Sequence, residues 1–168
     1  MKKVKFSGIL VALLLVLTTV QPVLAQDYYF EIPEAQVDVF LETDGTVTVE
    51  YYYKFNNNAG AHVIDYVDIG MPGNSQYSLS DISATIDGHA ITDITDSPYV
   101  DGVALGLGAY SIQPGASGIL YMRAENISNL YYYASEKESE DYTSINFQPN
   151  YFGSDYVSGS TSMTFNFH

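Results

Sequence analysis

Ala35–Phe55, which reads AQVDVFLETDGTVTVEYYYKF, decides the fold of this chain. On both sides of the pair Asp44-Gly45, apolar side chains alternate with polar ones along the stretch. Alternation with a period of two is typical of a β-strand that has one buried face. A short loop containing Asp-Gly between two such runs predicts a β-hairpin in which Gly45 takes a positive φ.

The second strand of this hairpin is rich in tyrosine, so its buried face must be assigned. One face carries apolar and aromatic side chains, namely Val47, Val49, Tyr51, Tyr53 and Phe55. The other face carries Thr46, Thr48, Glu50, Tyr52 and Lys54. Because burying Glu50 and Lys54 without partners would cost several kcal/mol, we expect the first face to fill the core and the second to face outward.

The same alternation returns along the rest of the chain. It is found in the stretches 63–69, 82–86, 89–94, 103–107, 120–124, 130–133, 145–147 and 161–167. Asp87-Gly88, between two of these stretches, predicts a second hairpin with a two-residue turn. No long stretch has apolar residues at helical spacing. Together the patterns predict an all-β fold, a single antiparallel, immunoglobulin-like β-sandwich of about eight or nine strands.

The N-terminus has the layout of a secretory signal peptide. Basic residues within Met1–Lys5 precede the apolar run Phe6–Val20, and the small residue Ala25 follows. We therefore predict a signal peptide at residues 1–25, cleaved between Ala25 and Gln26, and an extracytoplasmic domain at residues 26–168, secreted or at the cell surface. A retained membrane anchor is the alternative, although the run is shorter than the roughly 20 apolar residues that a spanning helix needs.

Charge and composition exclude several classes of function. The chain has 6 Lys+Arg against 20 Asp+Glu, a net charge of −14. Three of the basic residues precede the predicted cleavage site, so the mature domain would carry 3 − 20 = −17. Such an acidic chain is not expected to bind nucleic acid or an anionic membrane surface. The absence of Cys excludes disulfides and thiolate metal sites.

Three stretches together resemble a known family. They are the opening hairpin, Ile82–Ile94 (ISATIDGHAITDI) and Ile112–Ala124 (IQPGASGILYMRA), in this order behind a signal peptide. They resemble the extracytoplasmic β-sandwich of bacterial and archaeal predicted membrane proteins of unknown function. The resemblance implies no catalytic residues, and it implies that a C-terminal membrane anchor is missing here. The sequence also stops within an alternating strand, so we expect the domain to be truncated at its C-terminus.

Clustered carboxylates give one candidate metal site. Asp93, Asp96 and Asp101 fall in a single loop region, DITDSPYVD, and Ca²⁺ prefers several oxygen ligands of this kind. We interpret these residues as a candidate calcium site, the only cofactor that the sequence indicates. Unpatterned surface acid is the alternative. The second acidic stretch, Glu136–Asp141, is interpreted as a solvated loop.

The sequence assigns no catalytic residue. The imidazoles lack the spacing of a metal or catalytic site; they are His62, His89 and His168. Carboxylates are numerous, but nothing marks one raised-pKa acid and one ionised partner, as a two-carboxylate hydrolase would need.

Tyrosine is the compositional anomaly, with 16 residues in a chain without Trp. The runs Tyr51–Tyr53 and Tyr131–Tyr133 place rings on both faces of a strand, so that Tyr52 and Tyr132 are candidates for an exposed binding surface. The ordinary β propensity of tyrosine is the alternative explanation.

Three functional hypotheses follow. The first is a non-catalytic, extracytoplasmic module of a cell-surface or secreted protein with a structural or recognition role. The second is a carbohydrate-binding module of a secreted enzyme, possibly stabilised by calcium. The third is a two-carboxylate hydrolase, which requires a pocket with a matched acid pair. The partner is an unknown protein or a polysaccharide, with membrane contact only through the missing anchor.

Overall fold

A computed structural model describes residues 27–133, 143–153, 155–159 and 161–168. The predicted signal peptide, its cleavage site at Ala25 and Gln26, and the acidic stretch Glu136–Asp141 lie outside the described residues. Within the described part the protein is an all-β sandwich, as the sequence predicts, with only two short 3₁₀ turns at Leu79–Asp81 and Gly108–Tyr110. In the part that is described, no helix has the length and apolar character needed to cross a membrane.

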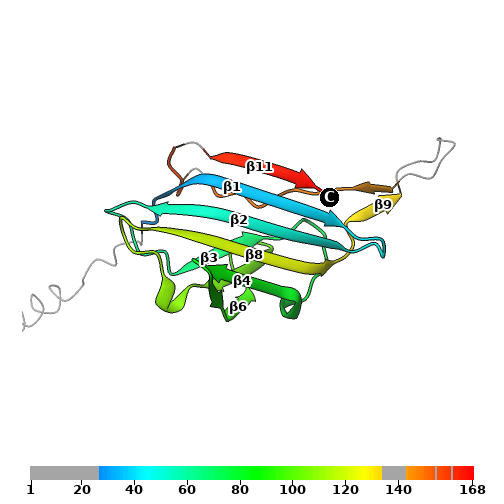
Figure 1. Cartoon of the computed structure of the whole chain (residues 1–168), viewed down its shortest axis with the longest axis horizontal. Coiled ribbons are helices and arrows are strands. Elements are labelled where there is room, and N and C mark those ends of the chain that lie inside the picture. The colour runs from blue at the N-terminus through cyan, green and yellow to red at the C-terminus, as the bar shows by residue number, and fades with distance from the viewer. Residues whose placement is uncertain (1–26, 134–142, 154, 160) are drawn as a thin grey trace, which may run out of the picture.

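The larger layer is a six-stranded sheet with the order β11-β1-β2-β8-β4-β5 (Figure 1). Its strands are β1 (Phe30–Leu41), β2 (Val47–Asn57), β4 (Ile82–Ile86), β5 (His89–Ile91), β8 (Ser117–Ile127) and β11 (Ser162–Phe167). A three-stranded sheet with the order β3-β7-β6 forms the second layer. Its strands are β3 (Tyr66–Gly70), β6 (Asp93–Asp96) and β7 (Gly102–Gly106). A separate two-stranded sheet pairs β9 (Tyr131–Tyr133) with β10 (Thr143–Ile145).

Both predicted hairpins are confirmed. β1 and β2 pair antiparallel with Val37 opposite Tyr51, and Gly45 in the connecting loop has a φ of 87°. β4 and β5 are joined by Asp87 and Gly88, whose φ values are 49° and 79°. Positive φ at both central residues is the geometry that matches the twist of the flanking strands in a two-residue turn.

One strand pair departs from the predicted antiparallel arrangement. β11 runs parallel to β1 at the edge of the large sheet, with Phe165 opposite Val37. The reason lies in the preceding chain, where the Phe30 N–H donates to the Tyr156 carbonyl at 3.0 Å. Because the chain meets β1 at its first residue shortly before β11 begins, β11 must run in the same direction as β1.

The buried face of β2 is the predicted one. Tyr51, Tyr53 and Phe55 expose at most 1% of their surface, whereas Tyr52 is only half-buried on the outer face. Thr48 is the exception, because it faces away from this set and yet exposes only 4%. The register between β2 and β8 shifts between Val47 and Val49, and this local irregularity removes Thr48 from regular alternation.

Residues 146–153, here called the strap, complete the second layer beside β3. The side chain of Asn150 accepts a hydrogen bond from the Gly70 N–H at 2.8 Å. Phe152 packs edge-on against Phe30, Tyr53 and Phe55 of the large sheet. The strap therefore lies over the inner face of β1 and β2, which the three strands of the small sheet leave uncovered, and it forms one side of a pocket.

Candidate aromatic binding pocket

A pocket of about 460 Å³ opens between the strap, β3 and the start of β1. Phenylalanine side chains form its floor, namely Phe30, Phe55 and Phe152. Their rings pack edge to face, with centroids 5.4 Å apart for Phe30 and Phe55 and 5.6 Å apart for Phe55 and Phe152. Phe30 and Phe55 belong to the core, so the floor is a fixed part of the fold.

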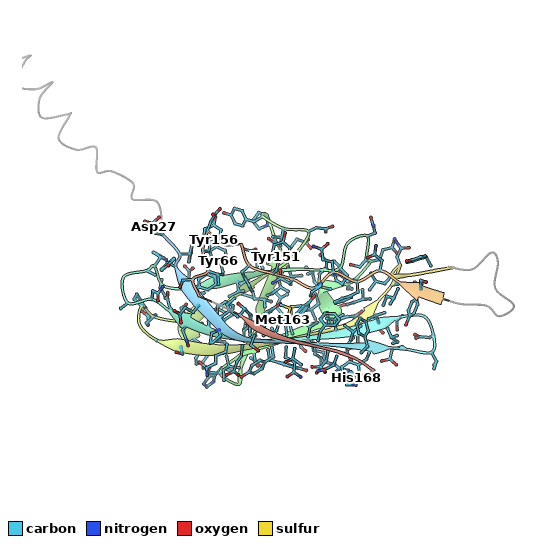
Figure 2. The ribbon with its side chains drawn as sticks, turned by 90° about the horizontal axis from the view of Figure 1, so that it is seen from above. Asp27, Tyr66, Tyr151, Tyr156, Met163 and His168 are labelled. Carbon is cyan, nitrogen blue, oxygen red and sulfur yellow. The ribbon has the colours of Figure 1, made fainter. Side chains whose placement is uncertain are left out.

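Tyrosines from four segments of the chain form the walls; they are Tyr28, Tyr66, Tyr99, Tyr151 and Tyr156. Tyr28 precedes β1, Tyr66 opens β3, and Tyr99 lies in the loop between β6 and β7. Tyr151 belongs to the strap and Tyr156 follows it. In Figure 2, Tyr66 and Tyr156 lie toward the end of the sandwich where Asp27 begins the described chain, and Tyr151 lies further along toward the middle.

The rings on the β3 side meet at two different angles. Tyr28 and Tyr66 have centroids 5.9 Å apart and planes at 79°, whereas Tyr66 and Tyr99 lie 6.4 Å apart with planes at 21°. The wall is therefore a corner and not a flat row. Tyr99 exposes 74% of its surface, and Tyr151 on the strap side exposes 70%. The pocket thus offers aromatic surface to solvent from two sides.

The loop that carries Tyr99 is held by a small hydrogen-bond network. The Ser97 hydroxyl donates to Oδ1 of Asp68 at 2.5 Å. The same hydroxyl oxygen accepts from the backbone N–H groups of Tyr99 and Val100 at 3.0 and 3.1 Å. Asp68 lies on β3 and lines the pocket, so this network fixes the loop relative to the sheet.

The charge of the pocket lining is negative. Among the described residues that line it, Asp68 is the sole ionisable carboxyl group and no Lys, Arg or His occurs. The Tyr28 hydroxyl donates to Oδ1 of Asp65 at 3.1 Å, just outside the lining. Burial, followed by the nearby charge of Asp65, raises the pKa of Tyr28, and burial also raises the pKa of Tyr66. Both phenols therefore remain protonated at neutral pH.

The structure does not bring the sequence-predicted tyrosines together. Tyr52 lies on the outer face of the large sheet opposite Tyr121, and Tyr132 lies on β9 and exposes 54% of its surface. Neither lines the pocket. The pocket tyrosines were missed because four of the five stand in loops and the fifth, Tyr66, stands at a strand end, where alternation gives little signal.

The candidate calcium residues are all exposed. Asp93 and Asp96 are the first and last residues of β6, and Asp101 precedes β7. Burial, followed by the charges of Asp96 and Asp101, raises the pKa of Tyr77. Within the described ranges, no group of three or more His, Asp or Glu residues is placed to hold a metal ion. Calcium binding by these residues stays a prediction.

The three histidines lie apart. His62 Nδ1 is 2.8 Å from the Val63 carbonyl, and its ring packs against Tyr28. His89 stacks on Tyr110 with centroids 4.0 Å apart. His168 lies at the edge strand β11, beside Asp38. Each imidazole therefore has a separate packing role.

Comparison with known proteins finds partial matches to solved structures at low sequence identity. The sequence matches no family model and no curated protein. A point mutant of the M1 zinc metallopeptidase from Deinococcus radiodurans has a TM-score of 0.49 and 12% identity, over 82% of this chain and 32% of that one. Aminopeptidase A from Legionella pneumophila, in complex with aspartic acid, has a TM-score of 0.40 and 8% identity, over 60% of this chain and 11% of that one. This chain thus spans a third or less of the length of either protein.

Proposed function

We propose that this chain is a non-catalytic, extracytoplasmic β-sandwich module of a secreted or cell-surface protein, and that it acts in recognition. The observation that carries the proposal is the pocket walled by tyrosines from four separate chain segments. The signal-peptide pattern and the resemblance to extracytoplasmic β-sandwiches support the location.

Recognition is favoured over a purely structural role by the physical character of the pocket. Its volume of about 460 Å³ lies in the range of small-ligand sites, which are mostly apolar with few polar groups. Tyrosine gives a large contact area at small conformational cost, because its ring is rigid and has a polar tip. Tyr99 and Tyr151 line the pocket and expose 74% and 70% of their surface.

The chemistry of the lining supports binding without catalysis. Hydrolysis by two carboxylates requires an acid pair across the substrate, and the described lining provides only Asp68. The protonated phenols of Tyr28 and Tyr66 are poor bases at neutral pH. What remains for a ligand is aromatic surface with a negative potential.

A carbohydrate-binding module is the second candidate function. The exposed rings of Tyr99, Tyr151 and Tyr156 around one pocket favour it, since flat aromatic surfaces can stack on sugar rings. The partner would then be a polysaccharide instead of a protein.

The test is a binding screen with matched variants. The purified domain, residues 26–168, is applied to immobilised glycans, peptides and small organic cations, together with the double variant Tyr99→Ala/Tyr151→Ala. The control is Tyr110→Ala, a tyrosine 47% exposed and outside the pocket. We expect at least one ligand that wild type and the control bind and the double variant does not. Binding lost instead in Tyr52→Ala or Tyr132→Ala would refute the pocket as the site.

A further inference from the structure

Tyrosine rings that lie at different angles to one another line the pocket, and this arrangement suits an organic cation. A cation is attracted to the face of an aromatic ring within about 6 Å of its centroid, and several faces at different angles add their effects. Tyr28 stands almost perpendicular to Tyr66, and Tyr99 lies nearly parallel to Tyr66. Tyr151 and Tyr156 line the same space from the strap side.

The charge around these rings also favours a cation. Asp68 lines the pocket, and Asp65 accepts the hydroxyl of Tyr28 next to it. The described lining contains no basic side chain, and the whole chain carries a net charge of −14. A low-dielectric aromatic wall with negative charge near it concentrates cations and repels anions.

Two polar side chains of the lining are already engaged within the protein. Oδ1 of Asp68 accepts from Ser97, and Oδ1 of Asn150 accepts from Gly70. The Asn150 carbonyl accepts from the buried hydroxyl of Tyr53 at 3.2 Å. These two side chains therefore offer few partners to the hydroxyl groups of a neutral sugar, and each hydroxyl left unpaired costs free energy. A trimethylammonium group has no hydrogen-bond donor or acceptor, so it leaves no hydrogen bond unmade there.

From these observations we propose that the pocket binds a trimethylammonium group of the kind that choline carries. The inference rests on the proposed recognition function, and it names the class of ligand. The methyl groups pack on the floor of Phe30, Phe55 and Phe152, and the cationic charge faces the tyrosine rings and Asp68. A primary ammonium binds more weakly, because it is strongly hydrated and would have to exchange its water for few free acceptors.

Four small probes, compared at constant ionic strength, separate the contributions of the positive charge, the methyl groups and an added phosphate to binding. Tyrosine fluorescence and calorimetric titration serve as readouts, since the chain has 16 Tyr and no Trp. Choline is compared with dimethylbutanol, its uncharged carbon analogue, and with ethanolamine, its primary-ammonium analogue. Phosphocholine distinguishes a free cationic ligand from a phospholipid headgroup or phosphocholine-bearing polymer. We expect choline to bind at least about tenfold more tightly than dimethylbutanol and ethanolamine. We expect phosphocholine to bind more weakly than choline, because Asp65 and Asp68 repel its phosphate.

Variants on opposite sides of the pocket assign the site. Tyr99→Ala and Tyr151→Ala should each weaken choline binding about tenfold, with Tyr99→Phe recovering most of the loss because the ring face is kept. Asp68→Asn should weaken choline more than dimethylbutanol. The controls are Tyr110→Ala and Glu42→Gln, which remove an exposed ring and an exposed carboxylate outside the pocket. Equal losses in the control variants would overturn the assignment.

The outcomes also separate this inference from the proposed function. Dimethylbutanol binding as tightly as choline would overturn the cationic ligand while leaving a recognition pocket in place. An oligosaccharide that binds through Tyr99 and Tyr151, with no choline binding, would replace the inference by the carbohydrate-binding module. The absence of binding to every probe and to every member of the glycan and peptide screen would overturn both.

Discussion

The side-chain oxygen of Asn150 lies 2.8 Å from the backbone nitrogen of Gly70 and accepts its hydrogen bond across 80 positions of sequence. The backbone carbonyl of the same residue accepts from the hydroxyl of Tyr53 in the large sheet, at 3.2 Å. Asn150 exposes only 8% of its surface. One buried residue therefore joins the strap to both layers of the sandwich and sets the position of Tyr151 next to it.

Asn150→Ala should lower the free energy of unfolding by about 1–2 kcal/mol, because the half-buried Gly70 N–H would lose its acceptor. The strap would also lose its attachment to β3, so ligand binding at the pocket should weaken. Urea denaturation monitored by tyrosine fluorescence measures the first effect. The matched control is Asn146→Ala, an exposed asparagine on the same strap, which should change stability by less than about 0.5 kcal/mol. Equal stability of both variants would contradict the role given to Asn150.

Two adjacent tyrosines on β2 should lose very different amounts of stability when truncated to alanine. Tyr53 exposes 1% of its surface and packs against Phe55 and Phe152, so Tyr53→Ala should cost on the order of 3 kcal/mol through the cavity that it leaves. Tyr52 is half-buried on the outer face, and Tyr52→Ala should cost less than about 1 kcal/mol. Denaturant midpoints of the two variants measure the difference. Similar losses would mean that β2 is covered on both faces.

The success of the sequence prediction on β2 has a physical cause. Glu50 and Lys54 cannot be buried unpaired, and in the structure they face outward and pair with Arg123 and Glu34. This charge constraint fixes the parity of the whole strand, and with it the burial of Tyr51 and Tyr53. The sequence around β2 was sufficient to assign its buried face, because the face of each strand residue follows from that of its neighbours.

The pocket could not be predicted in the same way. Its walls come from segments around Tyr28, Tyr66, Tyr99 and Tyr151, and their meeting depends on how the strap crosses the large sheet. Alternation assigns a face to each strand but says nothing about which loops meet across two layers. The parallel pairing of β11 with β1 also depends on how the strap crosses the large sheet, so alternation did not predict it either.

Processing at the N-terminus is predicted to occur between Ala25 and Gln26. Expression of the complete sequence in a bacterium with a general secretion system should release a protein whose first residue is Gln26. N-terminal sequencing of the exported fraction measures this directly. Changing Ala25 to a bulky residue, as in Ala25→Phe, should block cleavage, because the site requires a small side chain. Recovery of intact Met1 in the membrane fraction of wild type would support a retained anchor instead.

Calcium binding by Asp93, Asp96 and Asp101 is tested by thermal stability. A ligand that binds only the folded state at about a hundred times its Kd stabilises by about 2.7 kcal/mol, which raises Tm by several degrees. Added salt also screens repulsion in a chain of net charge −14, so Mg²⁺ at equal ionic strength is the control. We expect a larger rise with Ca²⁺, lost in Asp96→Asn/Asp101→Asn. An equal rise with both ions would mean screening without a specific site.

Protonation of Asp38 at low pH should weaken the attachment of the edge strand β11. Asp38 on β1 accepts hydrogen bonds from His168 Nε2 at 2.9 Å, Asn166 Nδ2 at 2.8 Å and Gln36 Nε2 at 2.6 Å. His168 also stacks on Phe40 with ring centroids 4.4 Å apart. The side-chain contacts named here between the end of β11 and β1 therefore lie on the outer face of the sheet. Partial burial alone would raise the pKa of Asp38, but these hydrogen bonds outweigh it and hold the pKa below its usual range.

The pKa of Asp38 is lower in the folded state than in the unfolded state. Its contribution to stability is therefore fully present above the unfolded-state pKa of about 3.9. The contribution is lost as the pH falls through the still lower folded-state pKa. At pH 7, Asp38→Asn should therefore lower stability by about 1 kcal/mol, since the site is partly solvated and the charge-assisted bonds are screened. As the pH falls below about 4, the difference between wild type and variant should shrink. Urea midpoints at a series of pH values measure this, and hydrogen exchange at the amides of β11 shows whether the edge strand opens first. The control is Asp27→Asn, an exposed aspartate before β1 that should leave the pH profile unchanged. A difference between wild type and Asp38→Asn that stays constant from pH 7 to pH 2 would show that the charge of Asp38 does not hold β11 in place.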